Sequence, residues 1–158
     1  MDINSLWSDY DLNSKKQNSR CLAVNTILEG KYLVGPVLGQ GGFGITYIGY
    51  DNTLNTPVAI KEYYPSDIAG RTSLEGTVSP YTQTIDDYQK GKQRFLEESR
   101  TLAKFADHPC IVGVKDYFDA NDTAYMVMEY LEGINLKEYL KRKEEEMIEL
   151  DGRMVTLL

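Results

Sequence analysis

The distribution of apolar and polar positions divides most of this chain into short strands. Between Thr26 and Tyr130, five segments have the apolar pattern of β-strands. The turn residues Asn52 and Asn55 separate two of them, and Gly133 follows the last. We therefore predict strands over residues 31–38, 45–51, 57–63, 111–118 and 124–130.

One long helix is predicted between the third and fourth strands. Thr84, with Asp87 three positions later, has the spacing of a capping box, in which side chains satisfy the free amides of the first turn. The apolar positions continue at helical spacing to about Ala106, and Gly91 is a weak point because glycine disfavours a helix interior. The predicted buried face consists of Tyr88, Phe95, Leu102 and Phe105.

These elements predict an α+β domain. Short turns between neighbouring strands favour a five-stranded antiparallel sheet, with the helix packed on one face. We assign residues 26–133 to this domain. Residues 134–158 follow it with a short helix capped by Asn135 and an apolar end, Val155 to Leu158.

Residues 1–25 are predicted to be a separate, flexible segment. Residues 13–20 are polar and carry few helix or strand signals. Ahead of them, Ile3, Leu6, Trp7 and Tyr10 fall on one face of a helix. Two interpretations stay open: this face docks onto the domain or a partner, or the spacing is coincidental in a frayed tail.

Composition narrows the classes of function. The chain has 158 residues, 42% of them hydrophobic and 26% charged, which is ordinary for a globular domain. A net charge of −7 disfavours binding to nucleic acid or to anionic membranes. No apolar run has the length of a membrane span, and two cysteines predict neither a disulfide framework nor a metal site. We expect a cytoplasmic protein.

A glycine-rich turn and a following lysine carry the candidate chemistry. The turn, Gly39-Gln40-Gly41-Gly42-Phe43-Gly44, lies between two predicted strands, and glycine lets backbone amides approach phosphate oxygens because it has no Cβ. Lys61 on the next strand supplies a cation, and Ala59 leaves space for a flat base. A dinucleotide-binding motif would need a helix after the glycines, and a P-loop would need Gly-Lys-Ser/Thr. Neither is present.

This order of motifs resembles the small lobe of a eukaryotic-type protein kinase, in the bacterial Ser/Thr branch. The resemblance covers roughly residues 32–140 and implies ATP as the cofactor. Leu38 and Thr46 would sandwich the adenine, although the family commonly has valine at the second position. Ala59 would lie against the base, and Lys61 would bind the α- and β-phosphates. The residues expected at the phosphate loop are Gly39, Gly41, Gly42, Phe43 and Gly44.

The resemblance also implies a catalytic ion pair between Lys61 and Glu98. Glu98 lies three residues after Phe95, at the family's pairing position, and Glu97 would point about a third of a turn away. A helix in the active position would bring Glu98 within salt-bridge distance, and a helix rotated outward would not. One extra residue before His108 weakens this register. The alternative is that both glutamates are surface charges.

A hinge is implied at the end of the fifth strand. Met128 falls at the gatekeeper position, and the backbone of Glu129 and Leu131 would hydrogen-bond the adenine edge. The residues from Ile60 to Arg71, which include Tyr63-Tyr64-Pro65, also resemble the bacterial branch, and we expect a packing role for Tyr63 to Arg71.

The large lobe of a kinase supplies the catalytic base and the Mg²⁺ ligands, and the corresponding motifs do not follow Tyr130. We therefore expect a chain truncated before the catalytic loop, with no metal site of its own. Mg²⁺ and the protein substrate would bind only in the full-length protein, and the exposed apolar surface would favour self-association. The alternative function is a non-catalytic, pseudokinase-like module that binds a nucleotide or a protein.

Overall fold

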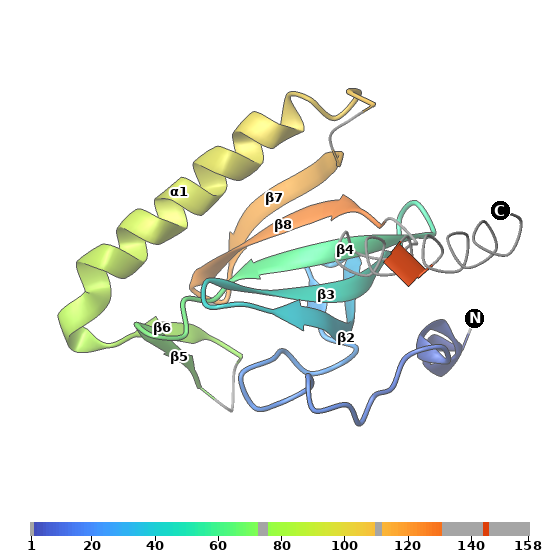
Figure 1. The fold of residues 1–158 in the computed structure, drawn as a ribbon, viewed down its shortest axis with the longest axis horizontal. Coiled ribbons are helices and arrows are strands. Elements are labelled where there is room, and N and C mark those ends of the chain that lie inside the picture. The colour runs from blue at the N-terminus through green and yellow to red at the C-terminus, as the bar shows by residue number, and fades with distance from the viewer. Residues whose placement is uncertain (1, 73–75, 110–111, 131–143, 146–158) are drawn as a thin grey trace, which may run out of the picture.

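The computed structural model describes residues 2–72, 76–109, 112–130 and 144–145. A curled antiparallel sheet forms the body, with the order β1-β2-β3-β4-β8-β7, and one long helix packs against it (Figure 1). The main strands are β2 (Tyr32–Gln40), β3 (Gly44–Asp51), β4 (Thr56–Tyr63), β7 (Val114–Ala120) and β8 (Thr123–Glu129). The smaller elements are η1 (Ile3–Trp7), β1 (Ile27–Leu28), β5 (Ala69–Arg71), β6 (Val78–Pro80) and η2 (Thr82–Thr84), and the long helix is α1 (Ile85–Ala103).

The five predicted strands are confirmed as β2, β3, β4, β7 and β8. The sheet has a sixth strand because the chain reverses at Glu29 and Gly30, whose φ angles are 51° and 66°. This reversal pairs the two residues of β1 with the start of β2. The fold class, an α+β lobe with one major helix, is thus confirmed with one additional edge strand.

The long helix begins where the sequence predicts, but its N-terminus is held differently. Thr84 is the N-cap residue, yet its side chain caps no amide of α1. Its hydroxyl instead donates to the carbonyl oxygens of Ile68 and Tyr81, at 2.8 and 3.0 Å. The predicted capping box is therefore wrong. The helix ends at Ala103, so Phe105 lies beyond it and is exposed.

Alternation along each strand assigns side chains to two faces of the sheet. On the face toward the main core, Tyr47, Ile60 and Val127 are fully buried, and Phe95 and Leu96 of α1 pack against this core. The side chains of Thr46, Ala59 and Lys61, among others, alternate with these and belong to the opposite face. The register places Thr46 opposite Lys61 and Ala59 opposite Met128.

The N-terminal residues lie against the sheet, where the sequence predicts a flexible segment. In Figure 1 they run below β2 and β3, on the side away from α1. Trp7 and Leu22 are each only 3% exposed, and the amide of Leu22 donates to the Tyr47 hydroxyl at 3.0 Å. Polar residues between Asn13 and Arg20 form hydrogen bonds both within the segment and to β2, so low hydrophobicity there does not prevent packing. The domain boundary at residue 25 stays a prediction.

Buried tyrosines make the fold sensitive to alkaline pH. Burial raises the pKa of Tyr88 to about 12 and raises the pKa values of Tyr47 and Tyr125 further. A group whose pKa is raised by folding contributes stability that is complete below its unfolded pKa, about 10 for tyrosine, and is lost as the pH rises through the folded value. Stability should therefore fall above about pH 10.

We expect the ionisation of the buried tyrosines, followed by absorbance, to be delayed in the folded chain. These tyrosines should ionise only as the circular dichroism signal of the fold disappears, at roughly pH 12. The same chain in concentrated urea should titrate in one phase. A single phase near pH 10 for the folded chain would show that these tyrosines are accessible.

Candidate ATP site

The glycine-rich turn joins β2 to β3 and leaves open space above the sheet. The Gly41 amide donates to the Gly44 carbonyl at 2.9 Å, which closes the hairpin. A Cβ added to Gly39, Gly41 or Gly42 would meet no heavy atom within 4 Å. Phe43 stands at the tip and is 81% exposed. A loop with bare backbone amides and free volume is able to bind phosphate oxygens.

The residues after β4 hold this loop in place. The amide of Tyr64 donates to the carbonyl of Phe43 at 3.0 Å, and the amide of Ser66 donates to the carbonyl of Gly42 at 3.2 Å. Gly44 is needed at the base, because a Cβ there would lie 2.9 Å from the Glu62 carbonyl oxygen. The Tyr-Pro-Ser segment therefore has the predicted packing role, and the hydrogen bonds show that it acts on the glycine loop.

The residues expected around the adenine come together at neighbouring positions of the sheet. Leu38 lies at the end of β2, and the strand register places Thr46, Ala59 and Met128 on three successive strands. Ala59 is 9% exposed, and Leu38, Thr46 and Met128 are partly exposed. Glu129 ends β8 beside them. Leu131 lies outside the described residues.

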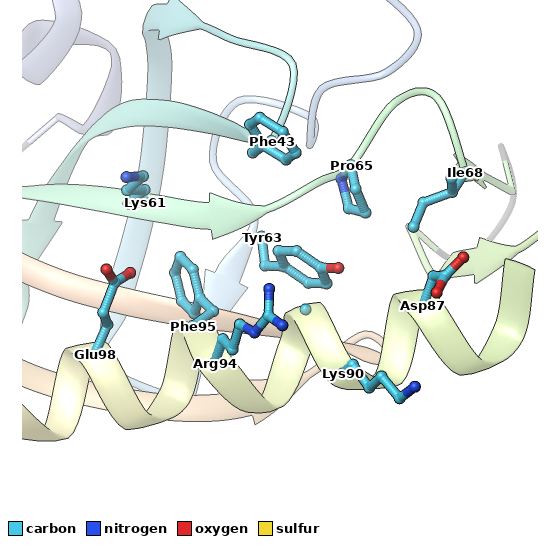
Figure 2. A pocket seen from close by; sticks show the side chains of 11 residues that line it. Phe43, Lys61, Tyr63, Pro65, Ile68, Asp87, Lys90, Arg94, Phe95 and Glu98 are labelled. Carbon is cyan, nitrogen blue, oxygen red and sulfur yellow. The ribbon is translucent and has the colours of Figure 1, made fainter.

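Lys61 and Glu98 line one cavity of about 430 Å³ between the glycine loop and α1. Figure 2 shows Lys61 on β4 above the helix and the Glu98 carboxylate pointing toward it. Phe43 covers the cavity from the loop, and Phe95 forms part of its wall. Glu97 does not line this cavity and instead accepts a hydrogen bond from Gln93 at 3.3 Å.

Lys61 and Glu98 face each other without making the contact expected for an active helix position. Among the described residues, no ion pair within 4.0 Å joins them. Both side chains belong to exposed residues. The electrostatic character of the cavity is mixed, because Lys90 and Arg94 line it together with Asp87.

The position of α1 over this cavity depends on Gly91. Tyr63, at the end of β4, donates its hydroxyl to the Tyr88 carbonyl at 3.1 Å, and the Tyr63 ring packs on Phe95. A Cβ added to Gly91 would lie 2.2 Å from the Tyr63 hydroxyl oxygen. Gly91, whose low helix propensity disfavours this part of α1, therefore allows the helix to approach β4.

A buried charge network lies on the opposite face of β4, next to Lys61. Glu62 is fully buried and accepts hydrogen bonds from the hydroxyls of Tyr47 and Tyr125, at 2.9 and 2.5 Å. Its third partner is the guanidinium of Arg71, on β5, in a buried ion pair. Burial raises the pKa of Glu62 despite these donors, and the carboxylate in turn raises the pKa of Arg71 against the effect of burial.

Sequence reasoning did not find this network. A charged residue inside an apolar strand was a signal, but Glu62 follows Lys61 directly and reads as one more polar position. Arg71 lies in the polar stretch after Pro65, where the structure has the β5–β6 hairpin instead of turns alone. Neither the hairpin nor the pairing is encoded in a local pattern.

Neither a metal-binding cluster nor a membrane-spanning helix is found among the described residues. No group of three or more His, Cys, Asp or Glu side chains there is placed to hold a metal ion. None of the described helices combines the length and the apolar character required to cross a membrane.

Comparison with known proteins decides the family. Residues 32–156 match the protein kinase domain family. The chain belongs to the protein kinase domain family. The match includes the glycine loop, Lys61 and Glu98, so the cavity of Figure 2 is part of a kinase domain.

Bacterial serine/threonine-protein kinases are among its relatives. Serine/threonine-protein kinase B of Synechocystis is 29% identical over 73% of this chain and 18% of its own length. The probable serine/threonine-protein kinase YbdM of Bacillus subtilis is 31% identical over 83% of this chain and 44% of its own length. The chain thus spans less than half the length of these relatives.

Solved structures show the same fold. A structure described as PpkA-294 apo form has a TM-score of 0.75 and 31% sequence identity, and the match covers 81% of this chain and 45% of that one. A mutant form of the Mycobacterium tuberculosis PknI kinase domain has a TM-score of 0.52 at 21% identity, over 77% of this chain and 41% of its own. This second likeness shows the fold alone.

Proposed function

We propose that this chain is the ATP-positioning lobe of a Ser/Thr protein kinase. The observation that supports it best is the single cavity that brings the glycine loop, Lys61 and Glu98 together in a chain of this family. An added Cβ at Gly39, Gly41 or Gly42 would meet no heavy atom within 4 Å, which leaves room for phosphate oxygens to approach the loop. Serine or threonine as the acceptor rests on the names of the bacterial relatives.

Each element of the site has a distinct task in this proposal. ATP, when bound, supplies the phosphoryl group that is transferred. Leu38, Thr46 and Ala59 pack against the base, and Met128, Glu129 and Leu131 form its hinge side. The loop amides and Lys61 orient the phosphates, and Glu98 holds the lysine once α1 moves closer. Phe43 excludes water from the phosphates at the loop tip.

The proposal does not assign the Mg²⁺ ligands or the catalytic base to the described residues. No group of three or more His, Cys, Asp or Glu side chains among these residues is placed to hold a metal ion. In the proposal, both groups and the protein substrate belong to the large lobe of a full-length kinase. We also propose that the protein is located in the cytoplasm and that this chain self-associates.

Nucleotide titration tests the proposal directly. We expect the 158-residue chain to bind ATP weakly, with a dissociation constant of roughly 100 μM or more, because the cations of a solvent-exposed cavity offset little of the triphosphate charge. Lys61→Met should weaken binding about tenfold, since it removes a charge-assisted contact. Calorimetry measures both values.

A matched control is available in the same cavity. Lys90 also lines it, but this residue lies on α1, and in Figure 2 its side chain points away from the glycine loop and Lys61. Lys90→Met removes the same charge and should change ATP affinity by less than about twofold. Equal losses for the two variants would indicate general charge attraction. Sub-micromolar affinity would contradict the expectation that this chain holds only part of the ATP site. No binding at millimolar ATP would favour the non-catalytic, protein-binding alternative.

The chain by itself should not transfer phosphate. Metal-assisted charge stabilisation and the base supply most of the rate in this chemistry, and the proposal assigns them to the large lobe. A radiolabelled ATP assay with casein as acceptor should give no signal above buffer. Turnover that Lys61→Met abolishes would overturn this expectation.

A further inference from the structure

Trp7 is seated on the sheet through a specific fit. It is the only tryptophan of the chain and is 3% exposed. Its indole rests on Gly35 of β2, where an added Cβ would lie 2.7 Å from two ring carbons. The indole nitrogen donates to the Asn25 side-chain oxygen at 2.8 Å. Gly35 leaves room for the ring and Asn25 accepts from its nitrogen, so Trp7 occupies a defined position on the sheet.

The face that Trp7 covers is the one that carries the expected adenine contacts. Trp7 forms a buried cluster with Leu33 and Ile48, and Leu38 packs against it. Ile48 lies two residues after Thr46 on β3 and pairs with Ala59. Side chains two apart on a strand share a face, so the Trp7 cluster lies beside the proposed base site, and Leu38, one wall of that site, packs against the cluster.

Residues 2–25, which we name the N-terminal brace, also reach the hinge side of the site. The hydroxyl groups of Tyr10 and Tyr130 are 2.9 Å apart and form a hydrogen bond. Tyr130 directly follows Glu129, the proposed hinge residue, and packs at the edge of the Trp7 cluster. The brace therefore contacts the hinge from the same face of the sheet.

At its other end the brace is bonded to the base of the glycine loop. The Lys16 ammonium donates to the Leu38 carbonyl at 3.3 Å, and the Gln40 side-chain amide donates to the Lys16 carbonyl. The Val37 amide donates to the side-chain oxygen of Gln17 at 3.2 Å. One segment thus joins the two sides of the base site, which come from distant parts of the sequence.

We propose that the N-terminal brace pre-organises the adenine site, with Trp7 and Tyr10 as positioning residues. The Trp7 cluster restrains Leu38, and the hydrogen bond with Tyr10 restrains Tyr130, so less conformational freedom is lost when a base enters between them. This inference rests on the proposed ATP site but adds a contribution from residues outside the matched kinase region, which begins at residue 32. The inference requires that binding of the base change the environment of the Trp7 indole.

The test titrates the 158-residue chain with adenosine while two signals are followed. Binding itself is measured from amide chemical shifts around Ala59 and Met128, and the emission of Trp7 reports the brace. Inorganic tripolyphosphate is the control ligand, because it offers phosphates without a base. We expect adenosine to shift the Trp7 emission with the same dissociation constant as the amide signals, and tripolyphosphate to leave the emission unchanged.

Tyr10→Phe tests the hinge contact without removing an aromatic ring. It should weaken adenosine binding about threefold, because it loses one hydrogen bond that holds Tyr130. Tyr81→Phe makes the same change at a residue that is 54% exposed and should leave the affinity unchanged. A purely structural role of the brace would alter the melting temperature but would give no adenosine-dependent emission change in the wild type.

The outcomes separate the two proposals. If amide shifts report adenosine binding but the Trp7 emission stays constant and Tyr10→Phe binds like the wild type, the brace is only structural and this inference fails. If adenosine causes no amide shifts at all, the ATP site itself is wrong and the inference falls with it. Coincident curves and a weaker Tyr10→Phe variant support it.

Discussion

Replacing Glu62 by glutamine should lower the free energy of unfolding by about 3–5 kcal/mol, the usual cost of removing one partner of a buried ion pair. The side chain of Arg71 is 3% exposed and that of Glu62 is fully buried. The variant leaves the guanidinium buried without a carboxylate. It also weakens the acceptor for the hydroxyls of Tyr47 and Tyr125.

Urea unfolding followed by circular dichroism measures this loss. Glu129→Gln is the matched control, because Glu129 also lies near the end of a strand of the sheet but is exposed, and its loss of unfolding free energy should stay within about 0.5 kcal/mol. Adding Arg71→Met to Glu62→Gln should restore part of the stability, since the unpaired charge is removed. A loss below about 1 kcal/mol for Glu62→Gln would mean that the pair contributes little to the fold.

Gly91→Ala should move α1 away from β4 and destabilise the fold by about 1–2 kcal/mol. The added methyl meets the Tyr63 hydroxyl at 2.2 Å, and Tyr63 is itself 6% exposed and packed between Tyr88 and Phe95. Overpacking of this kind costs about 1–3 kcal/mol, and the better helix propensity of alanine offsets up to about 1 kcal/mol of it.

A double-mutant cycle separates the two contributions. Tyr63→Phe removes the nearest oxygen and leaves the ring, whose next atom is 3.0 Å from the added methyl. In the Tyr63→Phe background, Gly91→Ala should lower the free energy of unfolding by clearly less than in the wild type. Gln93→Ala, at an exposed helix position, should show no coupling to Tyr63→Phe. Equal costs in both backgrounds would show that Tyr63 does not set the helix position.

The regular elements were predictable because their signals are local. Alternation from Lys31 to Asp51 and helical spacing from Tyr88 to Leu102 each depend on neighbouring residues, and both match the structure to within a few positions. The motif from Gly39 to Lys61 also lies on two adjacent hairpins. Local order in the sequence was therefore enough to assemble the loop and the lysine on one side of the sheet.

Contacts between distant segments were not predictable in the same way. The burial of Trp7 depends on Gly35 and Ile48, and the burial of the Glu62 carboxylate depends on Arg71, which lies beyond a turn. Neither contact follows from a pattern of residues along a single strand or helix. The separation of Lys61 from Glu98 depends on how α1 packs as a body. A sequence motif fixes which residues face the cavity but not the position of the helix.

Labelling with an acyl-phosphate derivative of ATP tests the nucleotide site most directly. Attack by a lysine amine on the acyl carbon forms an amide and releases ATP, so the modified lysine is the one held next to the bound phosphates. We expect mass spectrometry to find the label mainly on Lys61 and only weakly on Lys90, with excess ATP preventing the reaction. Labels spread over exposed lysines, with no protection by ATP, would contradict the assignment of this lobe as an ATP-positioning domain.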